Sequence, residues 1–253
     1  MKNKKSLGQH WLTDRAVLLD IANLAAGKTN VVVEVGPGLG TLTSALLKFF
    51  DEVIAIEFDA ELARKLPGSF PGKKLRVINK DILSVDEEDL PEEYTLAGNI
   101  PYYITSPIVQ KFLAGKNKPK KMVLLMQKEV AERLAADAGD YSILGLSAQI
   151  YAKVSLGPVV GRGFFAPPPK VDSQVVVFEP YELPLATEST MALIKIGFSA
   201  PRKKLVSNLT AGLQLSREGV LEILSSLEVS GNARPADLTI KDWLALEKKL
   251  HKR

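Results

Sequence analysis

The tetrapeptide Asn99-Ile100-Pro101-Tyr102 combines residue types suited to holding an exocyclic base amine such as adenine N6. The lone pair of such an amine is delocalised into the ring, so the amine is a poor nucleophile until it is held in a defined orientation. The Asn99 side-chain oxygen and the carbonyl before Pro101 can each accept one N–H bond, because proline itself has no N–H to compete. Tyr102 would then stack on the base. The alternative is a strand-ending Asn-x-Pro turn with a core tyrosine.

A glycine-rich segment upstream indicates a nucleotide-type cofactor site. The apolar run 31–33 leads into the sequence E-V-G-P-G-L-G, and residues 41–47 then have helical spacing. A strand, a glycine turn and a helix in this order build such a site on a parallel sheet. Thr41 stands where the dinucleotide fingerprint needs its third glycine, so the spacing favours S-adenosylmethionine over NAD. A plain strand–helix turn is the alternative. The candidate cofactor residues of this segment are Glu34, Gly36, Gly38 and Gly40.

Two acids follow the next two predicted strands. Glu57 ends the apolar run 53–56, and Asp81 follows the run 75–78. An acid at the tip of the second strand is placed to accept both ribose hydroxyls of a cofactor. Asp81 would accept from the cofactor's adenine amine, and Ile82 would pack on the adenine ring. Either acid alone is more often a surface residue or a helix cap, but both lie at strand ends on one sheet edge, which favours a pocket.

The composition is that of an ordinary globular protein. The chain has 253 residues, 46% hydrophobic and 25% charged, which suits one large domain and a small one. It contains no cysteine, and its two histidines, His10 and His251, lie at opposite ends, so the sequence predicts no metal site. No apolar run is long enough to cross a membrane. We therefore expect a cytoplasmic, monomeric protein.

Four clusters of lysine and arginine suggest an acidic partner, although the formal net charge is only +4. The cluster at 248–253 is explained as cations at a helix C-terminus. The other three would supply the phosphate contacts of a polynucleotide, or else are ordinary solvated faces. Lys170 could reach a phosphate or pair with Asp172. The candidate polynucleotide-binding residues are Lys4, Lys5, Lys120, Lys121, Lys170, Arg202, Lys203 and Lys204.

Strand–helix alternation predicts an α/β fold with a Rossmann-like, doubly wound parallel sheet in residues 1–180, a domain that includes a basic N-terminal arm. Residues 14–26 are expected to be helical, with Asp14 as the cap. Residues 151–160 and 173–178 are predicted to be closing strands, partly antiparallel. Prolines at 180 and 184 mark a boundary before an all-helical domain, 181–253. Its predicted helices cover 187–199, 202–213, 216–227 and 239–249, so that Arg202, Lys203 and Lys204 open the second one.

The loop between the two closing strands contains three consecutive prolines, 167–169, which stiffen it. A stiff loop that presents Phe165 could hold one face of an extruded base while Tyr102 holds the other, and such stacking contributes on the order of 1–3 kcal/mol per base. The alternative is that the aromatic pair plugs the end of the sheet, which is the favoured interpretation for Phe164.

Taken together, these segments resemble the bacterial rRNA adenine N6,N6-dimethyltransferase family (KsgA type) over essentially the whole chain. The segments that carry the resemblance are Lys5 to Leu12 (K-S-L-G-Q-H-W-L), Glu34 to Thr43, Asn99 to Tyr102, Phe165 to Ser173 (F-A-P-P-P-K-V-D-S) and Phe198 to Leu205 (F-S-A-P-R-K-K-L). The proline loop and the Gly-Gln-x-aromatic-Leu arm together are more specific than either methylase motif alone.

The resemblance implies S-adenosylmethionine-dependent dimethylation of two adjacent adenines in the 3′-terminal hairpin of 16S rRNA, on an assembling small subunit. It implies cofactor contacts at His10, Leu12, Gly36, Glu57, Asp81 and Asn99. His10 is often Asn in the family, the residue at 11 is often Phe, and Pro201 stands where another basic residue is common. Pro201 bears on how strongly the helical domain docks to RNA.

The implied mechanism is in-line methyl transfer without a general base, with Asn99 as a hydrogen-bond acceptor. Two other functions compete: an erythromycin-resistance-type 23S rRNA methylase, which shares much of the motif set, and a ribosome-assembly binding factor with incidental catalysis. A DNA adenine methylase is disfavoured because no further recognition domain is present. Thr41 argues against a nicotinamide dehydrogenase.

Overall fold

The structure, a computed structural model, describes residues 10–251, with the side chain of Tyr102 excepted. By their internal contacts the residues divide into two compact units. The first comprises 1–132 and 152–180, and the second comprises 133–151 and 181–253. The first unit ends at residue 180, and residues 133–151 group with the second, helical unit.

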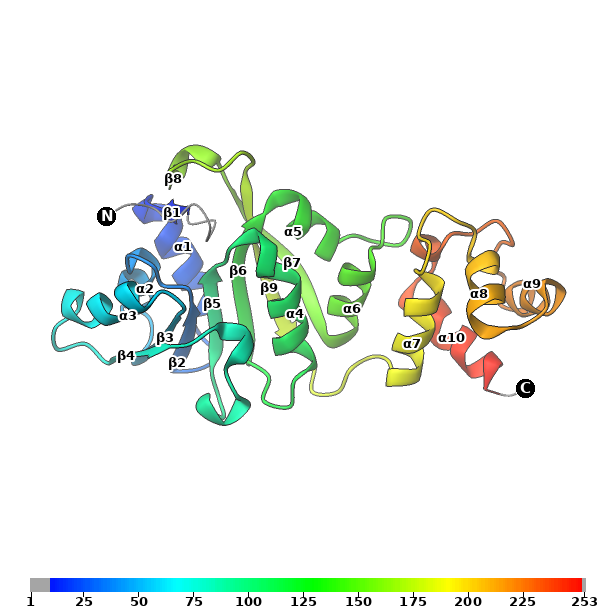
Figure 1. The fold of residues 1–253 in the computed structure, drawn as a ribbon, viewed down its shortest axis with the longest axis horizontal. Coiled ribbons are helices and arrows are strands. Elements are labelled where there is room, and N and C mark those ends of the chain that lie inside the picture. Colours follow the sequence, from blue (N-terminus) through cyan, green and yellow to red (C-terminus); the bar gives the residue numbers. More distant parts are fainter. Residues whose placement is uncertain (1–9, 252–253) are drawn as a thin grey trace. The chain divides into compact units, whose positions relative to one another are not determined.

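A seven-stranded sheet forms the centre of the first unit, in the order β4-β3-β2-β5-β6-β9-β7 (Figure 1). The first five strands in this order are parallel to one another, and β9 pairs antiparallel with both β6 and β7. Their bounds are β2 Val31–Val35, β3 Glu52–Glu57, β4 Leu75–Asn79, β5 Thr95–Asn99, β6 Lys121–Gln127, β7 Ala152–Val160 and β9 Ser173–Pro180. This is the Rossmann-like sheet that the strand–helix alternation predicts.

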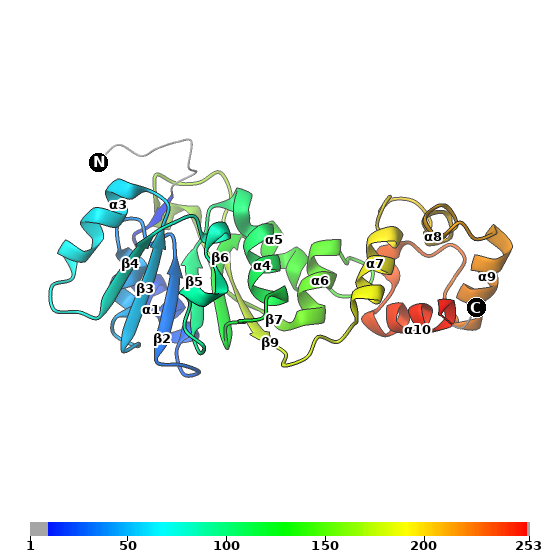
Figure 2. The same cartoon turned by 60° about the horizontal axis from the view of Figure 1, so that its bottom comes forward.

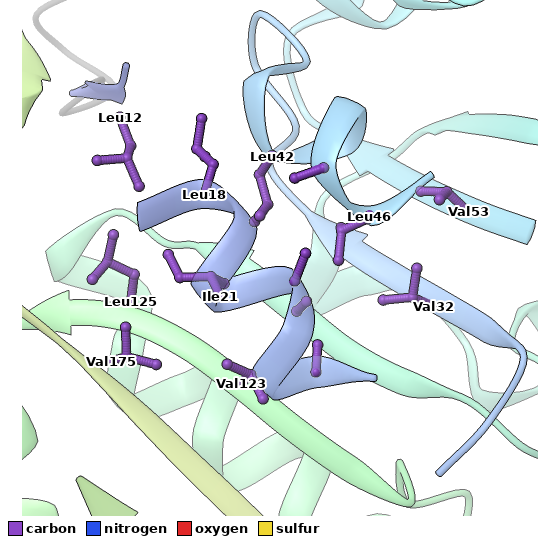
Figure 3. Packing of buried hydrophobic residues seen from close by; sticks show 14 of the residues in the cluster. Leu12, Leu18, Ile21, Val32, Leu42, Leu46, Val53, Val123, Leu125 and Val175 are labelled. Carbon is purple, nitrogen blue, oxygen red and sulfur yellow. The ribbon is translucent and has the colours of Figure 1, made fainter. Parts of the chain in front are cut away.

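Helices cover both faces of this sheet because its central strands are apolar on both sides. The helices of the unit are α1 Arg15–Ala25, α2 Thr41–Leu46, α3 Ala60–Lys65, α4 Thr105–Ala114 and α5 Lys128–Leu134, the last partly in the helical unit by contact. Asp14 begins α1 as predicted, accepting from the Val17 N–H at 3.0 Å. Figure 3 shows Leu18 and Ile21 of α1 packed with Leu42 and other apolar side chains in one buried cluster.

The connection β2–α2–β3 runs toward one edge of the sheet, and the connection β5–α4–β6 runs toward the other. Because such connections are right-handed, α2 and α4 lie on opposite faces of the sheet. The chain therefore reverses its strand order between β2 and β5. In open α/β sheets such a switch point, at the carboxyl ends of the strands, is where ligands bind.

A second, two-stranded sheet lies beside the large one. Strand β1 (Trp11–Leu12) pairs antiparallel with β8 (Phe165–Ala166), which belongs to the loop between β7 and β9. Figures 1 and 2 show this loop rising beyond the carboxyl ends of the strands. The proline loop and the N-terminal segment are thus tied together across more than 150 residues of sequence.

The second unit is helical: α6 Ile143–Tyr151, α7 Glu188–Gly197, α8 Leu205–Leu213, α9 Arg217–Ser226 and α10 Ile240–Leu250. The four predicted C-terminal helices are present, each within three residues of its expected ends. Their apolar faces form one core around Trp243, which is fully buried. Side-chain caps at Thr187, Ser216 and Thr239 begin α7, α9 and α10. Arg202 and Lys203 precede α8, and Lys204 is its N-cap, so this basic cluster lies in a loop and not within the helix as expected.

Candidate active site

A cavity opens at the carboxyl ends of the parallel strands, where the switch point predicts it. Its walls come from the ends of β2, β3 and β5, the loop after β4, and β1. Of the predicted site residues, it brings together His10, Leu12, Glu34, Gly36, Gly38, Glu57, Asp81, Ile82, Asn99 and Pro101.

Glu57, at the tip of β3, holds the glycine loop in place. One carboxylate oxygen accepts from the Gly38 N–H at 3.0 Å, and the other accepts from the Asp59 N–H at 2.8 Å. Burial raises the pKa of Glu57, and these two backbone donors oppose the shift. Each carboxylate oxygen retains a second lone pair, so the group can still accept from a bound diol.

Glu34 forms the floor of the cavity at the end of β2 and is 1% exposed. The hydroxyl of Thr43, on the first turn of α2, donates to its carboxyl oxygen at 2.6 Å. Burial raises the pKa of Glu34 from 4.5 to about 8, with the charge of nearby Glu57 adding to the rise and the Thr43 bond opposing it. A cationic ligand in the cavity would favour its ionised form.

Asp81 caps the short 3-10 turn Ile82–Ser84, accepting from the Leu83 N–H at 2.9 Å. Lys80, beside it on the cavity wall, lies 2.9 Å from carboxylate oxygens of both Asp86 and Asp89. Those bonds raise the Lys80 pKa. The loop after β4 is therefore shaped by its own ion pairs before any ligand arrives.

Asn99 ends β5 and faces the cavity between the glycine loop and the 3-10 turn Tyr102–Ile104. Its side-chain N–H donates to the backbone oxygen of His10 at 2.9 Å. With the nitrogen end of the amide held by His10, the oxygen end is the part that can accept a hydrogen bond from a ligand. Pro101 lines the same wall, and the Tyr102 ring lies outside the described part of the structure.

The segment around β1 forms one wall of the cavity and is anchored at both ends. A His10 ring nitrogen lies 2.8 Å from the Pro167 oxygen, and the Thr13 N–H donates to the Phe164 oxygen at 2.9 Å. The Trp11 ring lies against Gly38. If Gly38 carried a Cβ atom, that atom would lie 3.0 Å from the indole nitrogen. Because Gly38 also has φ +57°, any larger residue there would be strained and would displace Trp11.

Gly40 and Phe165 were predicted to be site residues, but the structure does not place either in the cavity wall. Gly40 has φ +82°, and a Cβ there would meet Leu66 and Phe70 at 2.8 and 2.9 Å, so its glycine is required for packing. The Phe165 ring is 4% exposed and belongs to the core, because β8 pairs with β1 and Phe165 lies opposite Leu12. The ring exposed by this loop is that of Phe164, the reverse of the expected arrangement.

The structure also places Lys120 and Lys121 differently from the predicted RNA contacts. Lys121 begins β6 opposite Thr95, at the amino ends of the parallel strands and so at the sheet edge opposite the cavity. Its ammonium donates to the Leu24 and Ala26 oxygens and caps the C-terminus of α1. Lys120 forms an exposed ion pair with Glu93 at 3.2 Å. Lys121 therefore has a structural role, and the neighbouring Lys120 lies at the same edge of the sheet.

Six predicted polynucleotide-binding residues remain: Lys4, Lys5, Lys170, Arg202, Lys203 and Lys204. Lys4 and Lys5 lie outside the described residues. Lys170 is exposed near the start of β9, whose first residue pairs with the carboxyl end of β6. In the helical unit, the buried Asn208 amide donates to the oxygens of Gly197 and Ala200 and so shapes the basic loop. In that loop Arg202 and Lys203 are exposed, and Lys204 donates to the Asn232 side chain.

Other residues of the cavity wall were not identified as site residues from the sequence, and five of them have polar or aromatic side chains: Trp11, Thr41, Phe58, Lys80 and Tyr103. Each adjoins a residue that was identified, or a glycine of the turn, and adjacency was the only signal available. Phe58 and Tyr103 are 63% and 65% exposed, which is unusual for aromatic rings and suits a wall that a ligand completes.

The donor set fits S-adenosylmethionine. Carboxylates end two adjacent strands, a third lies in the next loop, and the glycine turn brings the backbone to the cavity surface without side chains in the way. This sheet and site define a Rossmann-like, S-adenosylmethionine-dependent methyltransferase.

Comparisons with known proteins then give the family. The chain belongs to the ribosomal RNA adenine dimethylase family, which matches residues 1–252. It is 39% identical over 255 residues to a protein named ribosomal RNA small subunit methyltransferase A from Dehalococcoides mccartyi (strain CBDB1), covering 97% of this chain and 88% of that one. A protein of the same name from Alkaliphilus oremlandii is 34% identical over 271 residues, covering 100% and 93%.

Solved structures agree with the fold. A dimethyladenosine transferase from Plasmodium falciparum superposes with a TM-score of 0.81 at 29% identity, covering 96% of this chain and 98% of that one. The 23S rRNA methyltransferase ErmE gives a TM-score of 0.78 at 28% identity, covering 95% and 99%. The chain is therefore an rRNA adenine dimethyltransferase that uses S-adenosylmethionine as its methyl donor.

Residues 10–251 lack two other kinds of feature. No group of three or more histidine, cysteine, aspartate or glutamate residues there could hold a metal ion. Among the helices of that described range, none is long and apolar enough to cross a membrane.

Proposed function

We propose that this protein dimethylates N6 of two adjacent adenines in the 3′-terminal hairpin of small-subunit (16S) rRNA, on an assembling small ribosomal subunit. It acts as a cytoplasmic monomer, with one cavity for both substrates. The names of the relatives support the small subunit as the substrate. The observation that carries the proposal is Asn99, which is oriented by His10 and shares one cavity with three carboxylates.

When bound, S-adenosylmethionine supplies a methyl group on a positively charged sulfur. Glu57 accepts from the ribose hydroxyls with the lone pairs that Gly38 and Asp59 leave unused. The second oxygen of Asp81 accepts from the adenine amine, and Ile82 packs on the ring. Glu34 ionises beside the positive charge, while Thr43 keeps its carboxyl group pointing into the cavity.

The target adenine enters beside Pro101. Its N6–H groups donate to the Asn99 side-chain oxygen and to the Ile100 carbonyl, which localises the nitrogen lone pair and directs it into the cavity. The amine would become positively charged as the new N–C bond forms and the bond from sulfur to the methyl group breaks, with the sulfur leaving as a neutral thioether; two carbonyl oxygens stabilise that charge. The methylated amine then loses one proton to solvent. Catalysis consists of positioning the amine and removing water from it. No side chain has to remove a proton before attack, because the neutral amine attacks a methyl group on a positively charged sulfur. For the second transfer only one N–H remains, and one of the two acceptors suffices.

RNA reaches this cavity through exposed cations. Lys170 lies at the cavity edge of the sheet, and Arg202 and Lys203 are exposed in the helical unit. Exposed lysine and arginine side chains neutralise phosphates and release counterions, which makes affinity strongly dependent on salt. Lys4 and Lys5 of the N-terminal arm belong to the same proposed set.

The proposal is tested by mass mapping. Purified protein is incubated with labelled S-adenosylmethionine and either unmodified small or unmodified large ribosomal subunits, and the modified nucleotides are located. We expect N6,N6-dimethyladenosine at two adjacent positions in the small-subunit rRNA. Methylation of the large subunit instead would favour the activity named for ErmE, to which the fold is similar. Tight binding without methyl transfer would favour the assembly-factor alternative.

A further inference from the structure

Three exposed apolar side chains and two exposed cations lie within residues 159–171, at the end of the β7–β9 hairpin. Val159, Phe164 and Val171 are 50%, 43% and 45% exposed, and Arg162 and Lys170 are exposed beside them. Val159 lies near the end of β7, and the other four belong to the segment between β7 and β9. Single exposed apolar residues are common on protein surfaces, but three within residues 159–171, accompanied by two cations, indicate a binding surface. We call this set the loop platform.

The backbone of the platform is rigid. The Phe164 N–H donates to the Gly161 oxygen at 3.0 Å. The Phe164 oxygen accepts from both the N–H and the hydroxyl of Thr13, each at 2.9 Å. The Phe164 ring lies over Gly161. A Cβ atom on that glycine would be 3.9 Å from two carbons of the ring. A ring held in this way loses little conformational entropy when a flat partner stacks on it.

The charges of the platform suit a phosphate backbone. The Arg162 N–H donates to Asp172 at 2.9 Å, so the one acidic side chain in the loop 161–172 is turned to a backbone donor. A guanidinium nitrogen of Arg162 lies 3.4 Å from the Lys170 oxygen, which brings the two cations to the same part of the loop. The positive charge is therefore exposed beside the apolar surface.

The platform lies close to the cavity. Ala166 pairs with Trp11, which is a wall residue, and Phe164 is two residues further along the same chain. Phe165 pairs with Leu12, also a wall residue, and the backbone oxygen of Phe164 accepts from the next residue, Thr13, so Phe164 lies one residue pair beyond the wall. This separation suits a nucleotide next to the one whose base enters the cavity.

We propose that Phe164 stacks on an unpaired base of the substrate rRNA that flanks the target adenine, while Arg162 and Lys170 contact its phosphates. This inference rests on the proposed function, because it takes its ligand from it. The aromatic face provides sequence-tolerant stacking, and the cations provide affinity for the backbone. A docking protein would have to present acidic side chains, and the experiments below distinguish it from RNA.

Three variants of the full chain test the stacking role: Phe164→Ala, Phe164→Trp and Phe49→Ala. Phe49 is the matched control because its ring is 40% exposed, and it lies just before β3, at the sheet edge opposite the cavity. Methyl transfer to unmodified small subunits is measured over a range of subunit concentrations at saturating S-adenosylmethionine. Cofactor affinity is measured separately by calorimetry.

We expect Phe164→Ala to raise the KM for small subunits by about tenfold, with kcat and cofactor affinity unchanged. Phe164→Trp and Phe49→Ala should behave as the wild type. A wild-type KM in Phe164→Ala overturns the inference, and so does an equal loss of cofactor affinity, which would make the ring merely structural. Failure of the wild type itself to methylate small subunits would instead overturn the proposed function.

A photoreactive benzoylphenylalanine at position 164 identifies the partner directly. After irradiation of the complex with small subunits, we expect crosslinks to rRNA within a few nucleotides of the methylated adenines. Crosslinks to a ribosomal protein, or to rRNA far from the target, contradict the inference, as does the absence of any crosslink under conditions where the wild type methylates. Lys170→Gln should reduce the salt dependence of subunit binding by about one unit of slope.

Discussion

The two halves of the cavity differ in charge. One half, built from the ends of β2 and β3 and the loop after β4, carries Glu34, Glu57 and Asp81. The other, built from the end of β5 and the turn after it, presents the neutral Asn99 and Pro101. In the proposed mechanism the acidic half meets a cofactor that carries positive charge, and the neutral half meets an amine that becomes positive only during the reaction.

Under the proposed mechanism, this difference explains why an amide, and not a carboxylate, ends β5. A carboxylate would attract the cofactor's positive sulfur before the target arrived, and it would add a half-buried acid to a cavity with two buried acids whose pKa values are already raised. A neutral acceptor interacts most strongly when the charge develops on the amine, which is in the transition state.

The largest expected effect comes from the neutral half. Asn99→Ala removes the acceptor, and we expect methyl transfer to fall by about 100- to 1,000-fold, as for loss of one well-placed hydrogen bond in a transition state. Cofactor affinity should fall only moderately, since the carboxylates remain. Methyl incorporation into small subunits together with cofactor calorimetry measures both quantities. Turnover close to that of the wild type would remove the basis for the acceptor role.

A second variant targets the acidic half. Glu57→Gln replaces a charged acceptor by a neutral one, and we expect cofactor affinity to fall by about 10- to 100-fold. Calorimetry with S-adenosylmethionine measures the change. Glu61→Gln, at an exposed carboxylate 2.6 Å from Lys65, is the matched control and should bind the cofactor normally. Equal affinities of the Glu57 variant and the wild type would contradict the assignment of this half to the cofactor.

The raised pKa of Glu34 predicts a pH dependence of stability. Between pH 4.5 and about 8 the folded cofactor-free protein keeps a proton that the unfolded chain has lost. The contribution of Glu34 to the free energy of unfolding is therefore fully present below pH 4.5 and decreases as the pH rises to about 8. Glu34→Gln should flatten the profile of Tm against pH and be more stable than the wild type above pH 8. Parallel Tm profiles for both proteins would show that Glu34 titrates normally.

The smallest expected effect lies outside both halves and tests whether RNA binding is confined to the cavity side. Lys121→Met removes the ammonium that caps α1, and we expect a loss of about 1 kcal/mol in the free energy of unfolding. Its affinity for small subunits should not change. Weakened RNA binding in the Lys121 variant would place RNA on the opposite edge of the sheet.

The double variant Arg202→Ala with Lys203→Ala should instead leave the free energy of unfolding unchanged. It should lower the slope of subunit affinity against salt concentration by about two.

Much of this site could be predicted from the sequence because parallel strands bring their carboxyl ends to one edge. Glu57, Asp81 and Asn99 each follow an apolar run, so their convergence follows from topology alone. The helix beginning after Asp14 could also be predicted, since capping is a local interaction.

The features that differ from prediction depend on contacts between distant segments. Lys121 caps a helix about 95 residues earlier in the chain, which a local cluster of lysines does not reveal. The exposure of Phe164 and burial of Phe165 follow from the pairing of β8 with β1, and a one-residue change of register would reverse them. Gly40 serves a contact with Phe70 that its motif does not indicate.

The central claim is that the acidic half holds the cofactor and the amide half activates the amine. The most direct measurement is the single-turnover rate of methyl transfer, at saturating cofactor and saturating small subunits, in Asn99→Ala and Glu57→Gln. Because saturation compensates for weakened cofactor binding, we predict a rate reduced by at least about 100-fold in Asn99→Ala and a rate within a few-fold of wild type in Glu57→Gln. Equal rate losses in the two variants, or a normal rate in Asn99→Ala, would contradict this division of roles.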